Sequence, residues 1–138
     1  MARLLDSRST KGGDALDNSP IEVVREFCAA WSRLNVEDLM GYFSADAIYH
    51  NMPGPPARGV AAVRRTIEGF LRGWDKTSWE IVRIAADGNT VLAERVDRTD
   101  AGEKHVDLPV VGVFEIEDGK IRAWRDYFDL ATYTRAMS

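Results

Sequence analysis

The sequence of 138 residues has little that could bind a metal or cross-link the chain: it contains one cysteine and two histidines. The single cysteine, Cys28, excludes an intramolecular disulfide and a zinc site built on cysteines, and it is typical of a protein of the reducing cytoplasm. No stretch approaches the roughly 18 apolar residues that a membrane-spanning helix needs. The net charge of −4 leaves no basic surface for a nucleic acid. These absences predict a cytoplasmic protein that binds neither membrane nor nucleic acid.

Composition predicts one folded domain that follows an unstructured segment. Residues 1–18 are polar and lack the apolar stretch of a secretory signal, so we expect a disordered N-terminal tail. Over the whole sequence 45% of residues are apolar and 29% are charged, which is ordinary for a globular protein. A chain of this length buries roughly two thirds of its unfolded surface on folding, enough for one core. We therefore expect a single domain over residues 19–138.

Three helices are expected in the first half of this domain. Ser19 begins a capping box, Ser-Pro-Ile-Glu, and apolar residues then recur at helical spacing as far as residue 34. Asn35 is expected to cap a second, short helix whose apolar positions include Phe43. A loop with three prolines follows, and the pattern predicts a third helix over residues 60–74.

Most of the remaining sequence has the pattern of β-strands joined by tight turns. Turn residues at 87–89 and at 117–120 each separate two apolar runs, which is typical of β-hairpins. The expected strands are residues 47–51, 79–86, 90–97, 106–116 and 121–128, and a short terminal helix is expected over residues 130–137. Helices followed by such strands predict an α+β fold, in which a curved sheet wraps around helices and leaves a deep apolar pocket.

Two polar clusters interrupt the apolar strands, at residues 94–97 and 124–129. Side chains alternate along a strand, so Arg95 and Asp97 share one face, while Asp126 shares a face with the aromatic residues two positions before and after it. If these faces meet inside the fold, an arginine lies between two carboxylates in an apolar cavity, and such charges are buried at high cost unless they are paired. The alternative is a surface ladder of ion pairs, which is common and contributes little.

Four motifs together make the sequence resemble the limonene-1,2-epoxide hydrolase family of the NTF2-like/SnoaL-like superfamily. They are Tyr49-His50-Asn51-Met52-Pro53, Glu94-Arg95-Val96-Asp97, Gly112-Val113-Phe114 and Trp124-Arg125-Asp126-Tyr127-Phe128-Asp129. The resemblance runs from about Ser19 to the C-terminus, with the motifs in order and at compatible spacing. It implies a cone-shaped fold, no cofactor or metal, usually a homodimer, and hydrolysis of small apolar or cyclic epoxides to vicinal diols without a covalent intermediate.

The resemblance places an acid–arginine–base triad on Asp97, Arg95 and Asp126, and two water-holding side chains on Tyr49 and Asn51. The alternation of side chains along a strand agrees with this placement, because Tyr49 and Asn51 lie on the same face of their strand. We expect Asp126 to be the general base and Asp97 the general acid. Two carboxylates in one site do not both ionise easily, so their titrations are coupled, and Arg95 allows one of them to remain anionic.

Eight residues are candidates for the substrate pocket from helical stripes, strand parity and the resemblance: Cys28, Trp31, Phe70, Trp74, Trp79, Leu108, Val110 and Phe128. Each is equally compatible with plain core packing, and Cys28 is expected to be a small hydrophobic residue rather than a nucleophile. The tryptophans are bulkier than the aliphatic residues expected there, which predicts a smaller or reshaped pocket and puts limonene oxide in doubt as the natural substrate.

Two alternatives of different kinds remain open. A ketosteroid-isomerase-like or polyketide-cyclase-like enzyme needs one carboxylate base and neutral donors, which an arginine between two carboxylates fits poorly. A non-catalytic binder of small apolar ligands has no need of five polar groups in its pocket.

His50 faces away from the site by parity and His105 lies in a charged connection, so no metal site is predicted. Asp129 is expected to cap the terminal helix.

Overall fold

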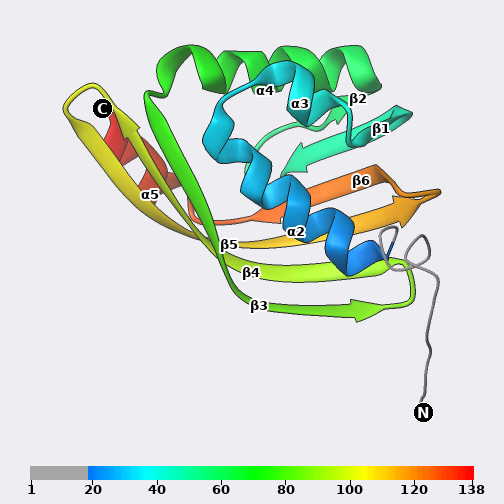
Figure 1. The fold of residues 1–138 in the computed structure, drawn as a ribbon. Helices are drawn as coiled ribbons and strands as arrows, with labels where there is room; N and C mark the ends of the chain where they lie inside the picture. The colour runs from blue at the N-terminus through cyan, green and yellow to red at the C-terminus, as the bar shows by residue number, and fades with distance from the viewer. Residues whose placement is uncertain (1–18) are drawn as a thin grey trace.

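A curved sheet of six strands is the centre of the fold in the computed structural model, which describes residues 19–138 (Figure 1). The strands are β1 (Phe43–Asn51), β2 (Ala57–Arg58), β3 (Lys76–Asp87), β4 (Thr90–Ala101), β5 (Lys104–Glu117) and β6 (Lys120–Tyr127), in the spatial order β2-β1-β6-β5-β4-β3. Neighbouring strands are antiparallel except β1 and β6, which are parallel. The sheet is therefore mixed. The predicted tail at residues 1–18 lies outside the described residues.

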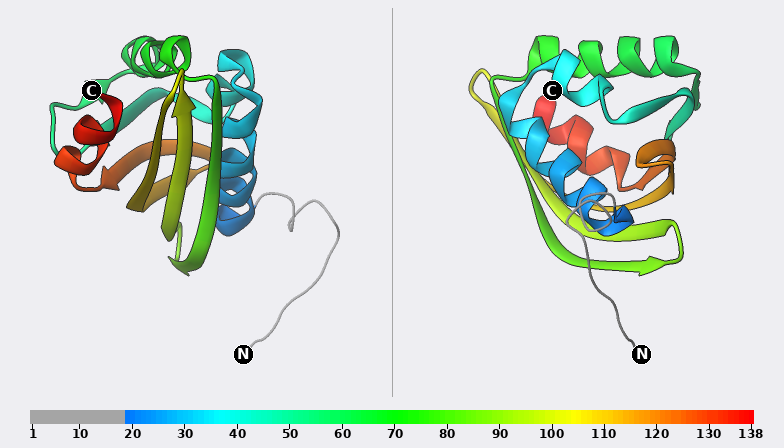
Figure 2. Two further views of the ribbon diagram at one scale, coloured as in Figure 1. Left: turned by 90° about the vertical axis from the view of Figure 1, so that its left-hand side faces the viewer. Right: turned by 45° about the vertical axis from the view of Figure 1, so that its right-hand side comes forward.

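The helices pack against the two halves of this sheet. They are α2 (Pro20–Ala30), the 3₁₀ turn η1 (Trp31–Arg33), α3 (Val36–Met40), α4 (Val60–Gly73) and α5 (Leu130–Met137). Helix α2 packs on β3 and β4, α4 on β1 and β2, and α5 on β5. Figure 2 shows the sheet curving around the space between α2, α4 and α5. None of the helices in residues 19–138 is long and apolar enough to span a membrane.

The predicted helix caps are confirmed. The side chains of Ser19, Asn35 and Asp129 accept hydrogen bonds from the backbone N–H groups three residues further on, at 3.2, 3.0 and 3.1 Å. The predicted helix ends differ, because α2 stops at Ala30 and the chain reverses where Leu34 adopts a left-handed φ of 51°. Caps are determined by neighbouring residues, so the sequence predicts them well.

Four of the five predicted strands are longer than predicted, and one strand was missed. Phe43 begins β1 rather than ending a helix, because it pairs with Ile121 of β6. Strands β4 and β5 run to the turn at residues 102–103, since pairing continues through polar residues as far as Ala101 and Lys104. The two-residue strand β2 has no local apolar pattern, and β6 ends one residue before Phe128. Pairing across the sheet thus extends strands beyond their apolar cores.

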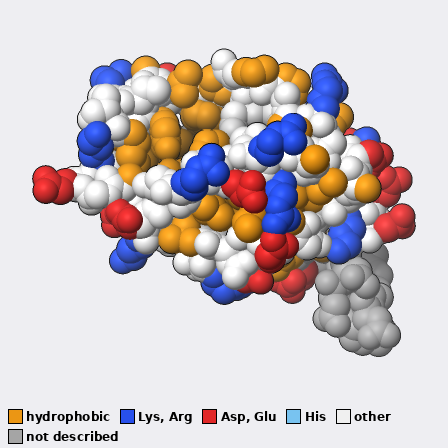
Figure 3. All heavy atoms as spheres, turned by 90° about the horizontal axis from the view of Figure 1, so that it is seen from above, with side chains coloured by type: hydrophobic (Ala, Val, Ile, Leu, Met, Phe, Trp, Pro, Cys, Tyr) orange, Lys and Arg blue, Asp and Glu red, His pale blue; other side chains and the backbone are white. Residues whose placement is uncertain are grey.

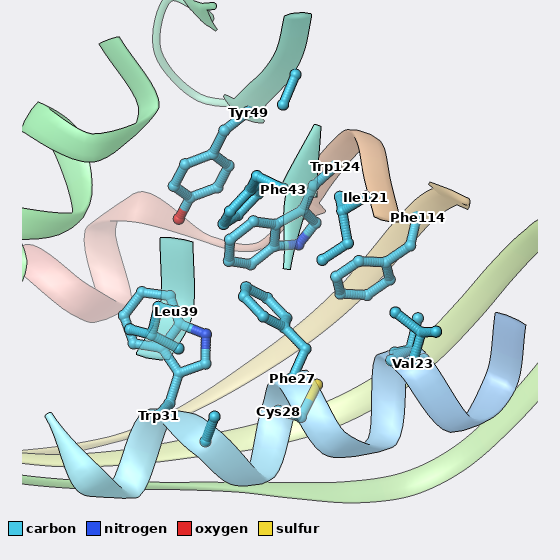
Figure 4. Packing of buried hydrophobic residues seen from close by; sticks show 14 of the residues in the cluster. Val23, Phe27, Cys28, Trp31, Leu39, Phe43, Tyr49, Phe114, Ile121 and Trp124 are labelled. Atoms are coloured by element: carbon cyan, nitrogen blue, oxygen red, sulfur yellow. The ribbon is translucent and has the colours of Figure 1, made fainter. Parts of the chain in front are cut away.

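The core is an aromatic cluster between α2 and the sheet (Figure 4). Trp124 of β6 lies at its centre, with the ring of Tyr49 stacked on it at 4.0 Å and the edge of Phe27 directed at it at 5.0 Å. Phe27 also contacts Phe43 and Phe114 edge-on. Such edge-to-face and stacked pairs add to the stabilisation from burial and define ring orientations. The strand that holds Asp126 is anchored in this cluster through Trp124.

Candidate active site

Arg95 lies between Asp97 and Asp126 and bonds both carboxylates in a bidentate manner. Its Nε and Nη2 donate to Oδ1 and Oδ2 of Asp97 at 2.9 and 2.8 Å. Its Nη1 and Nη2 donate to Oδ1 and Oδ2 of Asp126 at 3.1 and 2.7 Å. The exposed fractions of the three side chains are 0%, 10% and 5%. The buried arrangement is therefore present, and the alternative of a surface ladder is wrong for these three residues.

Strand register brings the remaining polar residues to the same place. In the parallel pairing of β1 and β6, Tyr49 lies opposite Trp124 and Asn51 opposite Asp126. The backbone N–H of Met52 donates to the carbonyl of Asp126 at 2.9 Å and continues this alignment. Tyr49, Asn51, Asp97 and Asp126 all border one cavity. The five residues that the resemblance singled out thus lie together, four on the cavity wall and Arg95 behind them.

The guanidinium of Arg95 also lies against an aromatic ring. Its central carbon lies 4.4 Å from the ring centre of Trp79, a cation–π contact. The indole of Trp79 donates from Nε1 to the hydroxyl of Thr77 at 3.1 Å, and this hydroxyl bonds that of Thr99 at 2.7 Å. Thr77 and Thr99 are buried. A chain of hydrogen bonds therefore orients the ring that faces the arginine.

Burial and charge give these groups different proton affinities. Burial raises the pKa of Asp97 above its ordinary value, although the charge of Arg95 opposes this rise. Burial opposes the charge on Arg95, but Asp126 and Asp97 raise its pKa well above the ordinary value. Burial, followed by the charge of Asp126, raises the pKa of Tyr49 well above its ordinary value. Asp97 is therefore suited to hold a proton, Arg95 remains a cation, and Tyr49 remains a hydrogen-bond donor.

The cavity is apolar apart from these groups and has a volume of about 210 Å³. Six of the predicted pocket residues border it: Phe70, Trp74, Trp79, Leu108, Val110 and Phe128. In the space-filling view of Figure 3, apolar side chains gather around a recess in the face that α4 occupies. The volume lies below the ~300–1,000 Å³ that is usual for drug-sized ligands. A small apolar molecule fits such a cavity.

Two predicted pocket residues do not border the cavity, which corrects the prediction. Trp31 and Cys28 are buried in the core on the α2 side. The ring of Trp31 stacks on Trp79 at 4.1 Å, so Trp79 separates it from the cavity. Burial raises the pKa of the Cys28 thiol to about 12. A helical apolar stripe identifies the buried face of α2, but it does not distinguish core from cavity wall.

Sequence reasoning missed four residues of the cavity wall: Pro53, Gly54, Leu130 and Tyr133. Tyr133 accepts a hydrogen bond at its hydroxyl from Trp74 Nε1 at 3.1 Å, which joins α5 to the end of α4. Leu130 and Tyr133 are three residues apart on a helix and so share a face. This spacing in the predicted terminal helix was the signal that could have found them.

Neither histidine reaches the cavity, as predicted. His50 Nε2 lies 2.8 Å from the carbonyl of Gly54, and the exposed His105 lies between Asp100 and Asp107. The carboxylates of Asp100 and Asp107 raise the pKa of His105. Within residues 19–138 no group of three His, Cys, Asp or Glu side chains is placed to hold a metal ion.

The curved mixed sheet around helices, with a cavity lined by apolar side chains and a few polar groups, defines an NTF2-like/SnoaL-like α+β fold. Two solved structures show this likeness of fold. A polyketide cyclase-related protein of Xanthomonas campestris pv. campestris is 20% identical, with a TM-score of 0.78 over 88% of this chain and 99% of that chain. A protein of Catenulispora acidiphila DSM 44928 with a ketosteroid isomerase-like fold is 19% identical, with a TM-score of 0.75 over 83% and 91%.

Comparison of sequences identifies the family as well as the fold. The family described as "Limonene-1,2-epoxide hydrolase catalytic domain" matches residues 18–138. The chain is 41% identical to the epoxide hydrolase EphG of Mycobacterium tuberculosis (strain ATCC 25618 / H37Rv) over 87 residues, which are 62% of this chain and 56% of that protein. A solved LEH-like epoxide hydrolase of M. tuberculosis is 34% identical, with a TM-score of 0.71 over 86% of this chain and 88% of that chain. The chain belongs to the limonene-1,2-epoxide hydrolase family.

Proposed function

We propose that the protein is a cofactor-independent hydrolase of small apolar or cyclic epoxides, which it converts to vicinal diols by direct attack of water with inversion at the attacked carbon. One observation carries this proposal: the carboxylates of Asp97 and Asp126 are both bonded to one buried arginine, and both border the same apolar cavity. Epoxide hydrolysis needs a base for water and an acid for the leaving oxygen at the same time, and this pair supplies both. Membership in the family supports the assignment.

Asp126 is the general base of this reaction. Its carboxylate is held by Arg95, and Tyr49 and Asn51 border the cavity beside it. Tyr49 keeps its proton because its pKa is raised, so its hydroxyl donates a hydrogen bond to the oxygen of a bound water. Asp126 accepts a proton from this water as its oxygen bonds the epoxide carbon.

Asp97 is the general acid. The carbon–oxygen bond of the epoxide breaks as the new bond to water forms, and the proton of Asp97 moves to the departing oxygen. The raised pKa of Asp97 favours the protonated form that this step needs. Each such proton transfer contributes about 10²–10⁴-fold to the rate.

The two alternatives fit the site less well. An isomerase or cyclase of the same fold stabilises an enolate with neutral donors, whereas Arg95 is a buried permanent cation with both carboxylates bound to it. A simple binder of apolar ligands is disfavoured because four polar side chains on the cavity wall weaken the binding of an apolar molecule.

The test is diol formation from limonene 1,2-epoxide and cyclohexene oxide, followed by chiral chromatography. Asp126→Asn and Asp97→Asn are each expected to lower turnover by at least about 10²-fold, the effect of removing a proton-transfer group. Asp118→Asn is the matched control, because Asp118 lies in a turn between β5 and β6 at a φ of 53° that asparagine tolerates. Turnover that survives in both site variants contradicts the proposal.

A second measurement separates direct hydrolysis from a covalent route. In a single turnover in ¹⁸O-labelled water, direct attack places the label in the first diol formed. If a carboxylate attacked the epoxide instead, the first diol would carry an unlabelled oxygen from Asp97 or Asp126. An unlabelled first-turnover diol therefore contradicts the water mechanism.

We further propose that the protein is a cytoplasmic homodimer formed through the outer face of the sheet. Val82, Leu92, Val111 and Tyr127 are large, exposed apolar residues on β3, β4, β5 and β6. An exposed apolar patch of this kind on a small protein indicates an interface. Light scattering after size-exclusion chromatography is expected to give twice the chain mass for the wild type. The Leu92→Glu variant is expected to have the mass of a single chain. A wild-type monomer contradicts the dimer without affecting the proposed reaction.

A further inference from the structure

The two carboxylate oxygens of Asp126 have different hydrogen-bond partners. Trp124 Nε1 donates to Oδ1 at 2.6 Å, and Arg95 Nη1 donates to the same oxygen at 3.1 Å. Among the described residues, Oδ2 receives a side-chain hydrogen bond from Arg95 Nη2 alone, at 2.7 Å. A carboxylate oxygen has about two acceptor positions. Oδ1 is therefore saturated, and Oδ2 retains one position for a further donor.

The indole of Trp124 is held so that its N–H cannot turn away. Trp124 is completely buried, and the ring of Tyr49 stacks on its indole with an angle of 5° between the ring planes. The rings of Phe114 and Phe27 contact it at 5.5 and 5.0 Å. Trp124 lies two residues before Asp126 on β6, so both side chains point to the same face. One ring thus contacts both the base and Tyr49.

We propose that Trp124 is a positioning residue for the general base: its N–H occupies Oδ1 of Asp126, so that Oδ2 accepts the proton from water, and its ring holds the Tyr49 phenol beside the same water. This inference rests on the function proposed above. It gives a chemical role to a residue that would otherwise be only the centre of the core.

Trp31 is a natural control for the purely structural role of Trp124. Both tryptophans are completely buried, and their rings lie 6.1 Å apart in the same cluster. The indole N–H of Trp31, however, has no hydrogen-bond partner among residues 19–138. Replacement by phenylalanine removes the same atoms at both positions, but only at residue 124 does it remove a hydrogen bond to a carboxylate.

The experiment compares Trp124→Phe with Trp31→Phe by steady-state kinetics over a range of pH. We expect Trp124→Phe to lower kcat about 10- to 100-fold, the effect of losing a hydrogen bond to a charged group, with KM changed less than about threefold. We also expect the acidic limb of its kcat/KM profile to move to higher pH, because a donor to the carboxylate form is lost. The other titratable groups that interact with Asp126 are unchanged in both variants: Arg95, Asp97, Tyr49 and Cys28.

Trp31→Phe is expected to lower the free energy of unfolding in urea by about as much as Trp124→Phe does. Its kcat/KM profile is expected to keep the acidic limb of the wild type. Equal shifts of the limb in the two variants, or no shift in either, overturn the proposal. If Trp124→Phe does not fold, benzothienylalanine at position 124 replaces it, because this residue keeps both rings and lacks only the N–H. Failure of the proposed function is recognised separately, since the wild type then forms no diol.

Discussion

Gly112 forms the surface on which the guanidinium of Arg95 rests: a Cβ at residue 112 would lie 2.6 Å from Nη1 of Arg95. The same Cβ would lie 2.8 Å from Oδ1 of Asp126. Gly112 is the β5 residue paired with Asp126 of β6 and with Ala93 of β4. It has no side chain because the space that the side chain would fill holds the charged cluster.

Gly112→Ala is therefore expected to displace Arg95 and Asp126 and to lower diol formation at least about 10²-fold, because misplaced catalytic groups lose this much rate. Overpacking of this buried site is expected to lower the free energy of unfolding in urea by about 1–3 kcal/mol. Gly69→Ala is the control: Gly69 is exposed on α4, and a Cβ there would meet only the end of the Arg72 side chain, at 3.9 Å. It is expected to stabilise by roughly 0.5–1 kcal/mol and to keep activity. An active Gly112→Ala enzyme contradicts this account.

Removal of Arg95 is expected to destabilise the protein strongly. Arg95→Leu leaves Asp97 and Asp126 buried without their partner, which costs about 3–5 kcal/mol in comparable buried clusters. Arg98 on the same strand pairs with Glu80, but its side chain is 44% exposed, so Arg98→Leu is expected to cost only about 0–1 kcal/mol. Urea denaturation of both variants measures the difference. Similar losses in the two variants would show that the buried pairs contribute no more than surface pairs.

The raised pKa of Asp97 predicts how stability depends on pH. A carboxyl group whose pKa is higher in the folded state contributes stability that is present below its unfolded pKa and is lost as pH rises through the folded pKa. The difference in unfolding free energy between Asp97→Asn and the wild type is therefore expected to shift in favour of the variant as pH rises from about 4, near the unfolded pKa. Urea titrations at several pH values test this. A shift in favour of the wild type contradicts the direction.

The single cysteine is expected to be unreactive in the native protein. Cys28 is 1% exposed, and burial raises its pKa to about 12, so almost no thiolate forms at neutral pH. A thiol reagent such as 5,5′-dithiobis(2-nitrobenzoic acid) is expected to label no cysteine until urea unfolds the chain, and then one. Rapid labelling of the native protein would show that α2 opens readily or that Cys28 is accessible.

Local features of the fold could be predicted because neighbouring residues determine them. The caps at Ser19, Asn35 and Asp129 need only a side chain and a nearby backbone N–H. Strand alternation placed Arg95 and Asp97 on one face, and the structure shows both bonded to each other. The ends of strands were less predictable, since residues such as Phe43 become strand only through their partner.

What the sequence determined by itself is the set of chemical groups and the face of each strand on which they lie. Only the tertiary structure decided that β1 runs parallel to β6 with Asn51 opposite Asp126, because this pairing joins segments about 75 residues apart that no local pattern connects. It also decided that Trp79 borders the cavity while Trp31 lies in the core behind it. Burial then separates the proton affinities of the site, because the free energy of a charge depends on how much water its neighbours exclude.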